Sequence, residues 1–181
     1  MRIRLRPAYT PEELGRIYKE PHNHREWKDH KLRVQTTIAA CTWFDARTVA
    51  DLSAGDAAII QATGANIKYV GDYAPGYEFT GAIENTIEQI PNVDLFILSE
   101  TLEHLDNPDA VLAQIRTKTR NLILTTPNGE TNSDNPQHYW GWDNHDVEEM
   151  LRAAKFNPQI YVAVDFFDPT LVYNYQIWGC S

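Results

Sequence analysis

The chain has 181 residues, 43% of them hydrophobic and 23% charged, which are the proportions of one globular domain with a substantial core. Its 16 basic and 25 acidic residues give a net charge of −9, which argues against a broad positive surface for duplex nucleic acid. Two cysteines are too few for a disulfide framework, and no apolar run approaches the roughly 20 residues of a membrane-spanning helix. The basic start, MRIRLRPAYT, lacks the apolar stretch of a signal peptide. We therefore expect a single domain, residues 1–181, in the cytoplasm.

Two helices are predicted near the N-terminus. Residues 10–20 (TPEELGRIYKE) form the first, because Thr10 is a good N-cap, Pro11 suits the first turn and Glu13 stands at the capping-box position. Residues 23–44 hold the second, which runs into the core.

Strands and helices alternate through the rest of the chain. The predicted strands are 48–53, 67–73, 77–83, 93–99 and 121–127, the predicted helices are 57–63, 108–119 and 144–156, and 158–167 and 171–180 form a closing antiparallel pair. Residues 93–99 (VDLFILS) are a near-continuous apolar run, typical of a strand buried on both faces. This order predicts an α/β fold with an open, mainly parallel sheet, which binds ligands at the carboxyl ends of its strands.

The turn after the strand at 48–53 has features of a nucleoside site. Its sequence, DLSAGDAAI (51–59), has small residues that let a ligand approach the backbone. The next strand ends near Asp72, where an acidic residue in this architecture binds ribose hydroxyls. An ordinary strand–helix loop, with Asp72 capping a turn, explains the same residues, so both interpretations stay open.

Ionisable side chains gather directly after the strand at 93–99. If Glu100 opens a helical turn, Glu103 and His104 follow on the same side of it. His138 follows the next strand, whose carboxyl end lies at the same edge of a parallel sheet. These side chains either cap and pack a helix start or bind a divalent metal ion.

The chain contains, in this order, the segments TVADLSAGDAA, YVGDYAPG, VDLFILSETLEHLDNPDAVL, NLILTTPN and HYWGWDNHDVEEMLRAAKF. Together these segments resemble the class I S-adenosylmethionine-dependent methyltransferases, over roughly residues 30–180. The chain is most similar to short methyltransferase-like proteins of actinobacterial phages. The resemblance implies a single-domain Rossmann-like fold and S-adenosylmethionine as the cofactor, in the host cytoplasm if the protein is phage-encoded.

The resemblance also implies a cofactor site with eight residues: Asp51, Ser53, Gly55, Asp72, Tyr73, Glu84, Asn85 and Ser99. The first turn and Ser99 would border the methionine part, Asp72 would bind the ribose, and Tyr73 and the two residues at 84–85 would contact the adenine. The basic, histidine-rich residues 21–33 fit a solvated amphipathic helix, which is the simpler interpretation. The alternative is a helical lid over the cofactor, residues 1–33, from which Arg33 would pair with the cofactor carboxylate as a ninth site residue. The family prefers glycine where this chain has Ser53 and Ala57.

The Glu-x-x-Glu-His pattern with a downstream histidine is similar to small-RNA 2′-O-methyltransferases and to O-methyltransferases of the ubiquinone pathway. This likeness implies that Glu100, Glu103, His104 and His138 hold magnesium, manganese or zinc, which orients a substrate hydroxyl near the sulfonium. Without a metal, His104 or His138 is the candidate general base.

Three aromatic residues, Tyr139, Trp140 and Trp142, either cover the core or line an acceptor pocket for a flat ring or a sugar. No Asn/Asp-Pro-Pro-Tyr motif follows the strand at 93–99, which disfavours methylation of exocyclic base nitrogens in DNA. No cysteine lies near the cofactor motifs as a nucleophile for carbon-5 of cytosine. We therefore expect O-methylation of a small-molecule, sugar or RNA-terminal hydroxyl. The alternatives are 2′-O-methylation at an RNA 3′ end and a non-catalytic module that only binds the cofactor.

Overall fold

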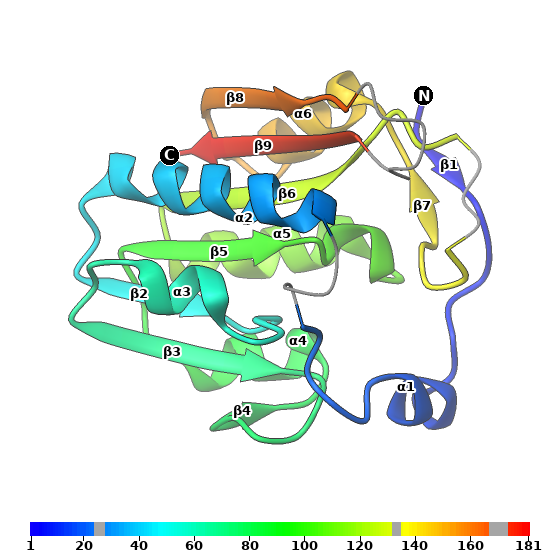
Figure 1. The fold of residues 1–181 in the computed structure, drawn as a ribbon, viewed down its shortest axis with the longest axis horizontal. Coiled ribbons are helices and arrows are strands. Elements are labelled where there is room, and N and C mark those ends of the chain that lie inside the picture. The colour runs from blue at the N-terminus through cyan, green and yellow to red at the C-terminus, as the bar shows by residue number, and fades with distance from the viewer. Residues whose placement is uncertain (24–27, 132–134, 167–173) are drawn as a thin grey trace.

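A seven-stranded β-sheet runs through the molecule in the order β4-β3-β2-β5-β6-β9-β8 (Figure 1). The computed structural model describes residues 1–23, 28–131, 135–166 and 174–181. The strands are β2 (Thr48–Asp51), β3 (Ile67–Asp72), β4 (Phe79–Thr80), β5 (Leu95–Ser99), β6 (Asn121–Asn128), β8 (Pro158–Val164) and β9 (Asn174–Cys180). Neighbours from β4 to β6 are parallel, and β9 is antiparallel to both β6 and β8. The predicted α/β fold, with a mainly parallel sheet closed by an antiparallel pair, is confirmed.

Helices cover both faces of this sheet. Figure 1 shows α2 (Lys28–Cys41) and α3 (Ala58–Ala62) in front, with α4 (Ile83–Thr86), α5 (Pro108–Lys118) and α6 (Asn144–Ala153) behind.

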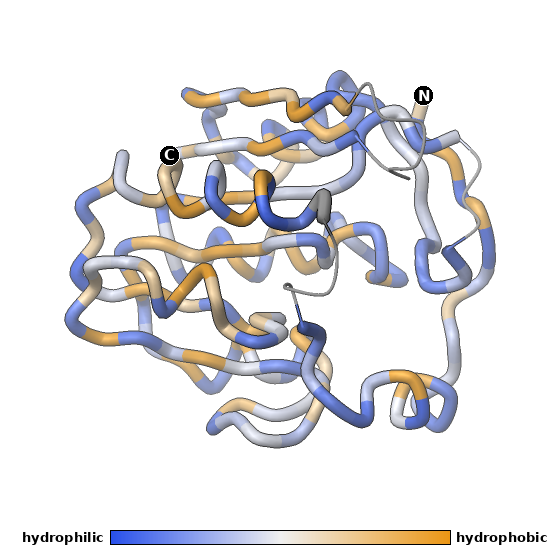
Figure 2. Tube along the Cα trace, viewed as in Figure 1, coloured by the Kyte–Doolittle hydropathy of each residue, from blue (hydrophilic) through white to orange (hydrophobic). Residues whose placement is uncertain are grey.

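The strand β5 explains why two layers of helices are needed. Its side chains alternate between the faces, so Leu95 and Ile97 join one core cluster while Phe96 and Leu98 join the other. Each of the four is at most 1% exposed, and β5 is accordingly among the hydrophobic parts of the trace in Figure 2. The prediction of a strand buried on both faces is confirmed for Leu95–Ser99, whereas Asp94, within the predicted range, is exposed.

Some elements differ in extent from the sequence prediction. The strand expected at 77–83 is limited to Phe79–Thr80, because Gly81 (φ 130°) turns the chain and α4 begins at Ile83. The second N-terminal helix is described from Lys28 to Cys41 and continues as the short 3₁₀-helix η1 (Thr42–Phe44). Residues 24–27, 167 and 171–173, which belong to predicted elements, lie outside the described residues.

The N-terminal segment contains two described elements, a capped helix and a short strand. The helix α1 (Pro11–Ile17) has the predicted capping box, in which the Thr10 side chain accepts from the Glu13 backbone N–H and the Glu13 carboxylate accepts from that of Thr10. Upstream, β1 (Ile3–Arg4) pairs antiparallel with β7 (Trp140–Gly141), a pairing that the sequence pattern did not predict. The guanidinium of Arg4 lies 4.6 Å from the centroid of the Trp140 ring, which holds this ribbon together.

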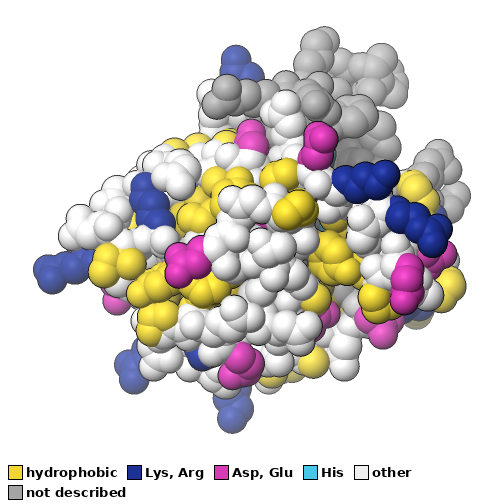
Figure 3. Space-filling view, turned by 90° about the horizontal axis from the view of Figure 1, so that it is seen from below, with side chains coloured by type: hydrophobic (Ala, Val, Ile, Leu, Met, Phe, Trp, Pro, Cys, Tyr) yellow, Lys and Arg dark blue, Asp and Glu magenta, His cyan; other side chains and the backbone are white. Residues whose placement is uncertain are grey.

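The surface carries charges of both signs. Figure 3 views the face on the side of β3 and β4, where basic and acidic side chains are interspersed with hydrophobic ones. Among the described helices, none is long and apolar enough to cross a membrane.

Replacement of Gly71 by alanine tests the edge of the sheet. A Cβ atom at Gly71 would lie 2.5 Å from the Phe79 carbonyl oxygen and 2.9 Å from its Cβ, so β4 would have to move. We expect Gly71→Ala to lower the free energy of unfolding by about 1–3 kcal/mol, which is the usual cost of overpacking. Urea denaturation is the measurement. Gly64→Ala is the matched control, because nothing lies within 4 Å of its new Cβ; it should stay within about 1 kcal/mol of wild type. Equal effects at both positions would show that β3 and β4 are not packed this closely.

Candidate functional site

A cavity of about 320 Å³ lies at the carboxyl ends of β2, β3 and β5, with the volume of a small-molecule site. Seven of the nine predicted cofactor residues line it: Arg33, Ser53, Gly55, Asp72, Tyr73, Glu84 and Ser99. Asp51 and Asn85 are not among the lining residues. The lining also includes Glu100, Glu103, His104, His138 and Tyr139, so the residues predicted for cofactor and for metal share one cavity.

The N-terminal segment forms another wall of this cavity. Its lining residues come from the loop before α1, from α1 and the chain after it, and from the first turn of α2: Ala8, Tyr9, Leu14, Tyr18, His22 and His30. Two ring contacts tie this wall to the rest of the site, between Tyr18 and Tyr73 (centroids 5.6 Å apart) and between Tyr9 and Tyr139 (6.0 Å).

Two buried carboxylates shape the turn after β2. Asp51 accepts a hydrogen bond from the Ser53 backbone N–H (3.2 Å), and Asp72 accepts one from that of Gly55 (2.8 Å). Burial raises the pKa of Asp51 to about 7. Asp51 therefore holds the turn from beneath rather than facing the cavity.

Of the two positions where the family prefers glycine, only one has left-handed backbone. Ala57 has φ 58°, a conformation that costs an L-residue roughly 1–2 kcal/mol, whereas Ser53 keeps a negative φ. The Ser53 side chain has a partner of its own, because its Oγ accepts from the Thr101 hydroxyl at 2.7 Å.

Asp72 ends β3 at the cavity wall and is 8% exposed. Besides the bond from Gly55, its second oxygen accepts from the Ala74 N–H at 2.8 Å. Burial raises the pKa of Asp72, and these backbone donors oppose the rise. A carboxylate fixed by two N–H groups is held in one orientation toward a ligand.

The fully buried Arg33 leads a hydrogen-bond network across the strand ends. Its Nη1 donates to Ser99 Oγ (2.6 Å) and to Thr125 Oγ1 (3.4 Å). The Thr125 hydroxyl in turn donates to Glu100 Oε1 (2.7 Å). Burial raises the pKa of Glu100, and the charge of Arg33 opposes that rise. Arg33 and Ser99 thus lie together at the cavity, as predicted residues of one site.

The prediction that Glu100 opens a helical turn is wrong. Glu100 has φ 50°, in the left-handed region, because the chain leaves β5 sharply and its N–H donates to the Thr125 carbonyl at 2.9 Å. The helical turn is the 3₁₀-helix η3 (Leu102–His104), which begins after this residue. Glu100 is consequently directed at Thr125 rather than at the neighbouring acid and imidazole.

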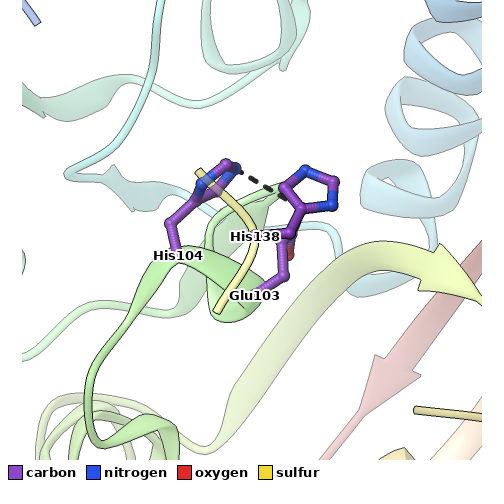
Figure 4. Close-up of side chains that lie close together, drawn as sticks. All are labelled: Glu103, His104 and His138. Atoms are coloured by element: carbon purple, nitrogen blue, oxygen red, sulfur yellow. Dashed lines mark ion pairs between the residues drawn. The ribbon is translucent and has the colours of Figure 1, made fainter. Parts of the chain in front are cut away.

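Glu103, His104 and His138 form a compact cluster (Figure 4), in which ligand-type atoms all lie within 4.8 Å of one another. Glu103 is fully buried, and its Oε2 accepts from the Thr126 hydroxyl at 2.9 Å. Its Oε1 has no hydrogen-bond donor among the described residues and lies 3.7 Å from His104 Nε2. Burial, together with the charge of Glu100, raises the pKa of Glu103 well above its usual range. A buried carboxylate oxygen without a donor is the feature that a cation would satisfy.

Each histidine of the cluster has an outer partner on its Nδ1. The His104 Nδ1 lies 2.9 Å from the Gln137 carbonyl oxygen, so it carries the proton and leaves Nε2 as the acceptor. The His138 Nδ1 lies 3.0 and 2.8 Å from the two carboxylate oxygens of Glu130. Burial and the neighbouring His138 lower the pKa of His104 to about 3, so it is neutral at physiological pH.

Glu130 was missed by the sequence analysis. It lies on the same connection as His138, eight residues upstream, and an acid that close to a candidate ligand is the signal that was available. Carboxylate–histidine pairs of this kind orient metal-ligating imidazoles.

The three predicted acceptor-pocket aromatics have different surroundings. Tyr139 lines the cavity, and its hydroxyl accepts from the Tyr9 N–H at 3.0 Å. Trp140 donates to the Leu105 carbonyl, and Trp142 is buried in the core with its Nε1 donating to Thr126. Neither tryptophan is among the lining residues of the cavity.

Comparison with known proteins gives matches in structure alone. No family model matches the sequence, and no curated protein matches it. The structure is similar to magnesium protoporphyrin IX methyltransferase from Synechocystis PCC 6803 with bound S-adenosylhomocysteine, over 93% of each chain, at 15% identity and a TM-score of 0.64. It is also similar to 1,6-didemethyltoxoflavin-N1-methyltransferase from Burkholderia thailandensis, over 97% of this chain and 91% of that one, at 18% identity and a TM-score of 0.59. A third is an S-adenosylmethionine-dependent methyltransferase from Clostridium acetobutylicum ATCC 824, over 94% and 98%, at 9% identity and a TM-score of 0.58.

At these identities the likeness establishes the fold. The chain has the Rossmann-like fold of class I S-adenosylmethionine-dependent methyltransferases in a single domain.

The raised pKa of Asp51 makes stability depend on pH. Its pKa of about 7 in the folded protein exceeds the ordinary 3.8, so the folded protein keeps this proton up to a higher pH than the unfolded chain does. Stability from this group is therefore complete below pH 4 and is lost as pH rises toward 7, by on the order of 2–4 kcal/mol.

We expect Asp51→Asn to remove this pH-dependent contribution to the free energy of unfolding. As the pH rises from 4 to 7.5, the wild type should therefore lose stability relative to the variant. Chemical denaturation across that range is the measurement, with the exposed Asp109→Asn as the control. A constant difference across the range would mean that Asp51 titrates normally.

Proposed function

We propose that this protein is an S-adenosylmethionine-dependent methyltransferase that methylates a hydroxyl oxygen with the help of a divalent metal. The observation that carries the proposal is the shared cavity, which joins the fixed carboxylate of Asp72 to the cluster of Glu103, His104 and His138. Donor and acceptor sites for methyl transfer must lie side by side, because the methyl group moves in line from sulfur to oxygen.

The cofactor would be held by the strand ends. Asp72 would bind the ribose hydroxyls, the turn at Ser53 and Gly55 and the hydroxyl of Ser99 would border the methionine part, and Arg33 would face its carboxylate. Residues 1–33 would act as a lid, since Tyr9 and Tyr18 already contact the opposite wall. Tyr139 would border the acceptor.

The cluster fits a divalent ion in its chemistry. It offers one carboxylate oxygen without a donor and two imidazoles, a set that suits magnesium, manganese or zinc. Glu103, His104 and His138 would hold the ion, and Glu100 would remain with Thr125. Such an ion lowers the pKa of an acceptor hydroxyl and orients it.

In the transfer itself, the acceptor oxygen forms a bond to the methyl carbon as the carbon–sulfur bond breaks. The products are a methyl ether and S-adenosylhomocysteine, and the hydroxyl proton leaves the acceptor. In a metal-free site, His138 would be the base at Nε2, because its Nδ1–H faces the Glu130 carboxylate and Nε2 is the acceptor. The Asn135 amide, 3.0 Å from that nitrogen, would give way to the acceptor.

Two further candidates rest on the same site. The 2′- and 3′-hydroxyls of an RNA 3′ end would suit a metal-bound cluster, and RNA binding that weakens steeply with salt would favour this acceptor. A non-catalytic module would bind the cofactor without turnover on any acceptor and would be indifferent to His138→Ala.

Replacement of Asp72 tests the cofactor site. We expect Asp72→Ala to weaken binding of S-adenosylhomocysteine at least tenfold, about 1.4 kcal/mol, because it removes the ribose contact and the partner of the Gly55 N–H. Asp72→Asn should lose less, since its amide oxygen still accepts. Isothermal titration is the measurement.

The control is Asp109→Ala, an exposed acid that pairs with Arg2 outside the cavity. Unchanged affinity in Asp72→Ala would remove Asp72 from the cofactor site. Failure of the wild type to bind S-adenosylhomocysteine would overturn the methyltransferase proposal.

The metal proposal predicts different results for the two glutamates of the motif. The measurement is Mn²⁺ affinity in chelator-stripped protein saturated with S-adenosylhomocysteine. We expect Glu103→Gln to reduce this affinity more than about 100-fold, which exceeds the usual loss when a residue that only hydrogen-bonds a metal ligand is replaced. Glu100→Gln should change it less than about tenfold, because its carboxylate is directed at Thr125. Equal losses would make Glu100 a ligand as well, and a wild type without Mn²⁺ affinity would leave His138 as a metal-free base.

A further inference from the structure

The connection between β6 and β7 holds Glu130 in the interior. Glu130 is 8% exposed, and its backbone is fixed at both sides of the connection. The Gly129 N–H donates to the Trp142 carbonyl at 2.9 Å, and a Cβ atom at Gly141 would overlap the Glu130 carbonyl oxygen. Glycine at 141 therefore permits the close approach that seats Glu130.

Both carboxylate oxygens of Glu130 reach one atom. They lie 3.0 and 2.8 Å from His138 Nδ1, which must therefore be the protonated ring nitrogen. The other nitrogen, Nε2, is an acceptor, and it lies 3.0 Å from the Asn135 amide nitrogen. His138 and Asn135 both line the cavity.

The two histidines of the cluster are supported differently. His104 has a neutral partner on Nδ1, the Gln137 carbonyl, which suffices to fix a tautomer. His138 has a buried carboxylate in the same role, although burying a charge is costly unless it is compensated. Because a carboxylate carries a negative charge, it strengthens the imidazole as a donor of its lone pair to a cation more than a neutral carbonyl does.

We propose that Glu130 is a positioning residue of the metal site, holding His138 with its Nδ1–H inward and its Nε2 lone pair toward a divalent cation in the cavity. This inference rests on the proposed function. Glu130 does not touch the cation; it acts through the orientation and the basicity of His138.

The test uses Glu130→Gln, which keeps an acceptor oxygen but loses the charge, and Glu130→Leu, which loses both. Glu88→Gln, an exposed acid outside the cavity, is the matched control. Long-range proton–nitrogen NMR correlations report the His138 tautomer in metal-free protein, and titration with Mn²⁺ in the presence of S-adenosylhomocysteine reports affinity. Titration with S-adenosylhomocysteine alone reports the cofactor site.

We expect Glu130→Gln to keep the Nδ1–H tautomer and to lose about tenfold in Mn²⁺ affinity, and Glu130→Leu to lose the tautomer preference and about 100-fold. Affinity for S-adenosylhomocysteine should stay within about twofold in both, because Glu130 contacts no predicted cofactor residue. A purely structural role would lower the melting temperature and leave tautomer and Mn²⁺ affinity unchanged.

Wild-type tautomer and Mn²⁺ affinity in Glu130→Gln and Glu130→Leu would overturn the inference. If Glu130→Leu does not fold, an unchanged Mn²⁺ affinity in Glu130→Gln alone would overturn it, because the charge is the part that the proposal needs. A wild type that binds S-adenosylhomocysteine but not Mn²⁺ would overturn the inference and the metal site while leaving the cofactor site standing. A wild type that binds neither would overturn the methyltransferase proposal itself.

Discussion

The burial of acidic side chains at one edge of the sheet is the constraint on which the rest of the site depends. Among the described residues, four buried acids, Asp51, Asp72, Glu103 and Glu130, are accompanied by a single buried arginine, Arg33. A charge in the protein interior is tolerated only where hydrogen bonds or an opposite charge compensate it. The different ways in which these acids are compensated separate the structural ones from the candidate ligand-binding ones.

Two of the acids have backbone partners and serve the turn after β2. Asp51 and Asp72 accept from N–H groups of that turn and of the chain after β3, so their positions are fixed before any ligand arrives. Glu130 is compensated by an imidazole, whereas Glu103 keeps one oxygen without a donor among the described residues. The remaining demand for positive charge is thus concentrated on the side of the two histidines. Both the sulfonium of the proposed cofactor and a divalent ion would bring positive charge to this cavity.

Much of the fold could be predicted from the sequence because its central elements have strong periodic signals. The apolar run in β5 is long enough to require cover on both faces, and the capping box at Thr10 fixes the start of α1. The pairing of β1 with β7 could not be predicted, because strands of two residues have no period to detect. Their contact depends on residues more than a hundred positions apart, Arg4 and Trp140.

The sequence predicted which residues lie at the site, but it did not predict the directions in which all of their side chains point. The positions of Asp72 and Ser99 followed from the strand ends, and the structure brings both to the cavity. The direction of Glu100 did not follow, because a helical turn was assumed where the chain instead adopts left-handed backbone. The closeness of Glu130 to His138 in the sequence made it a candidate, but the contact of its carboxylate with Nδ1 of that histidine is a tertiary contact that residue spacing does not determine.

The turn between β5 and η3 connects the proposed donor and acceptor sites. The Thr101 hydroxyl donates to Ser53 in the turn after β2, and the Thr101 carbonyl accepts from the His104 N–H at 2.9 Å. One residue therefore fixes the distance between the turn expected to border the methionine part and the histidine expected to bind a cation. Because methyl transfer would be sensitive to displacements of about 1 Å, this link gives a physical reason for the proposed metal ligands Glu103 and His104 to follow β5 so closely in the chain. His138, the one proposed ligand that comes from a more distant connection, has the Glu130 carboxylate on its Nδ1 to keep that alignment.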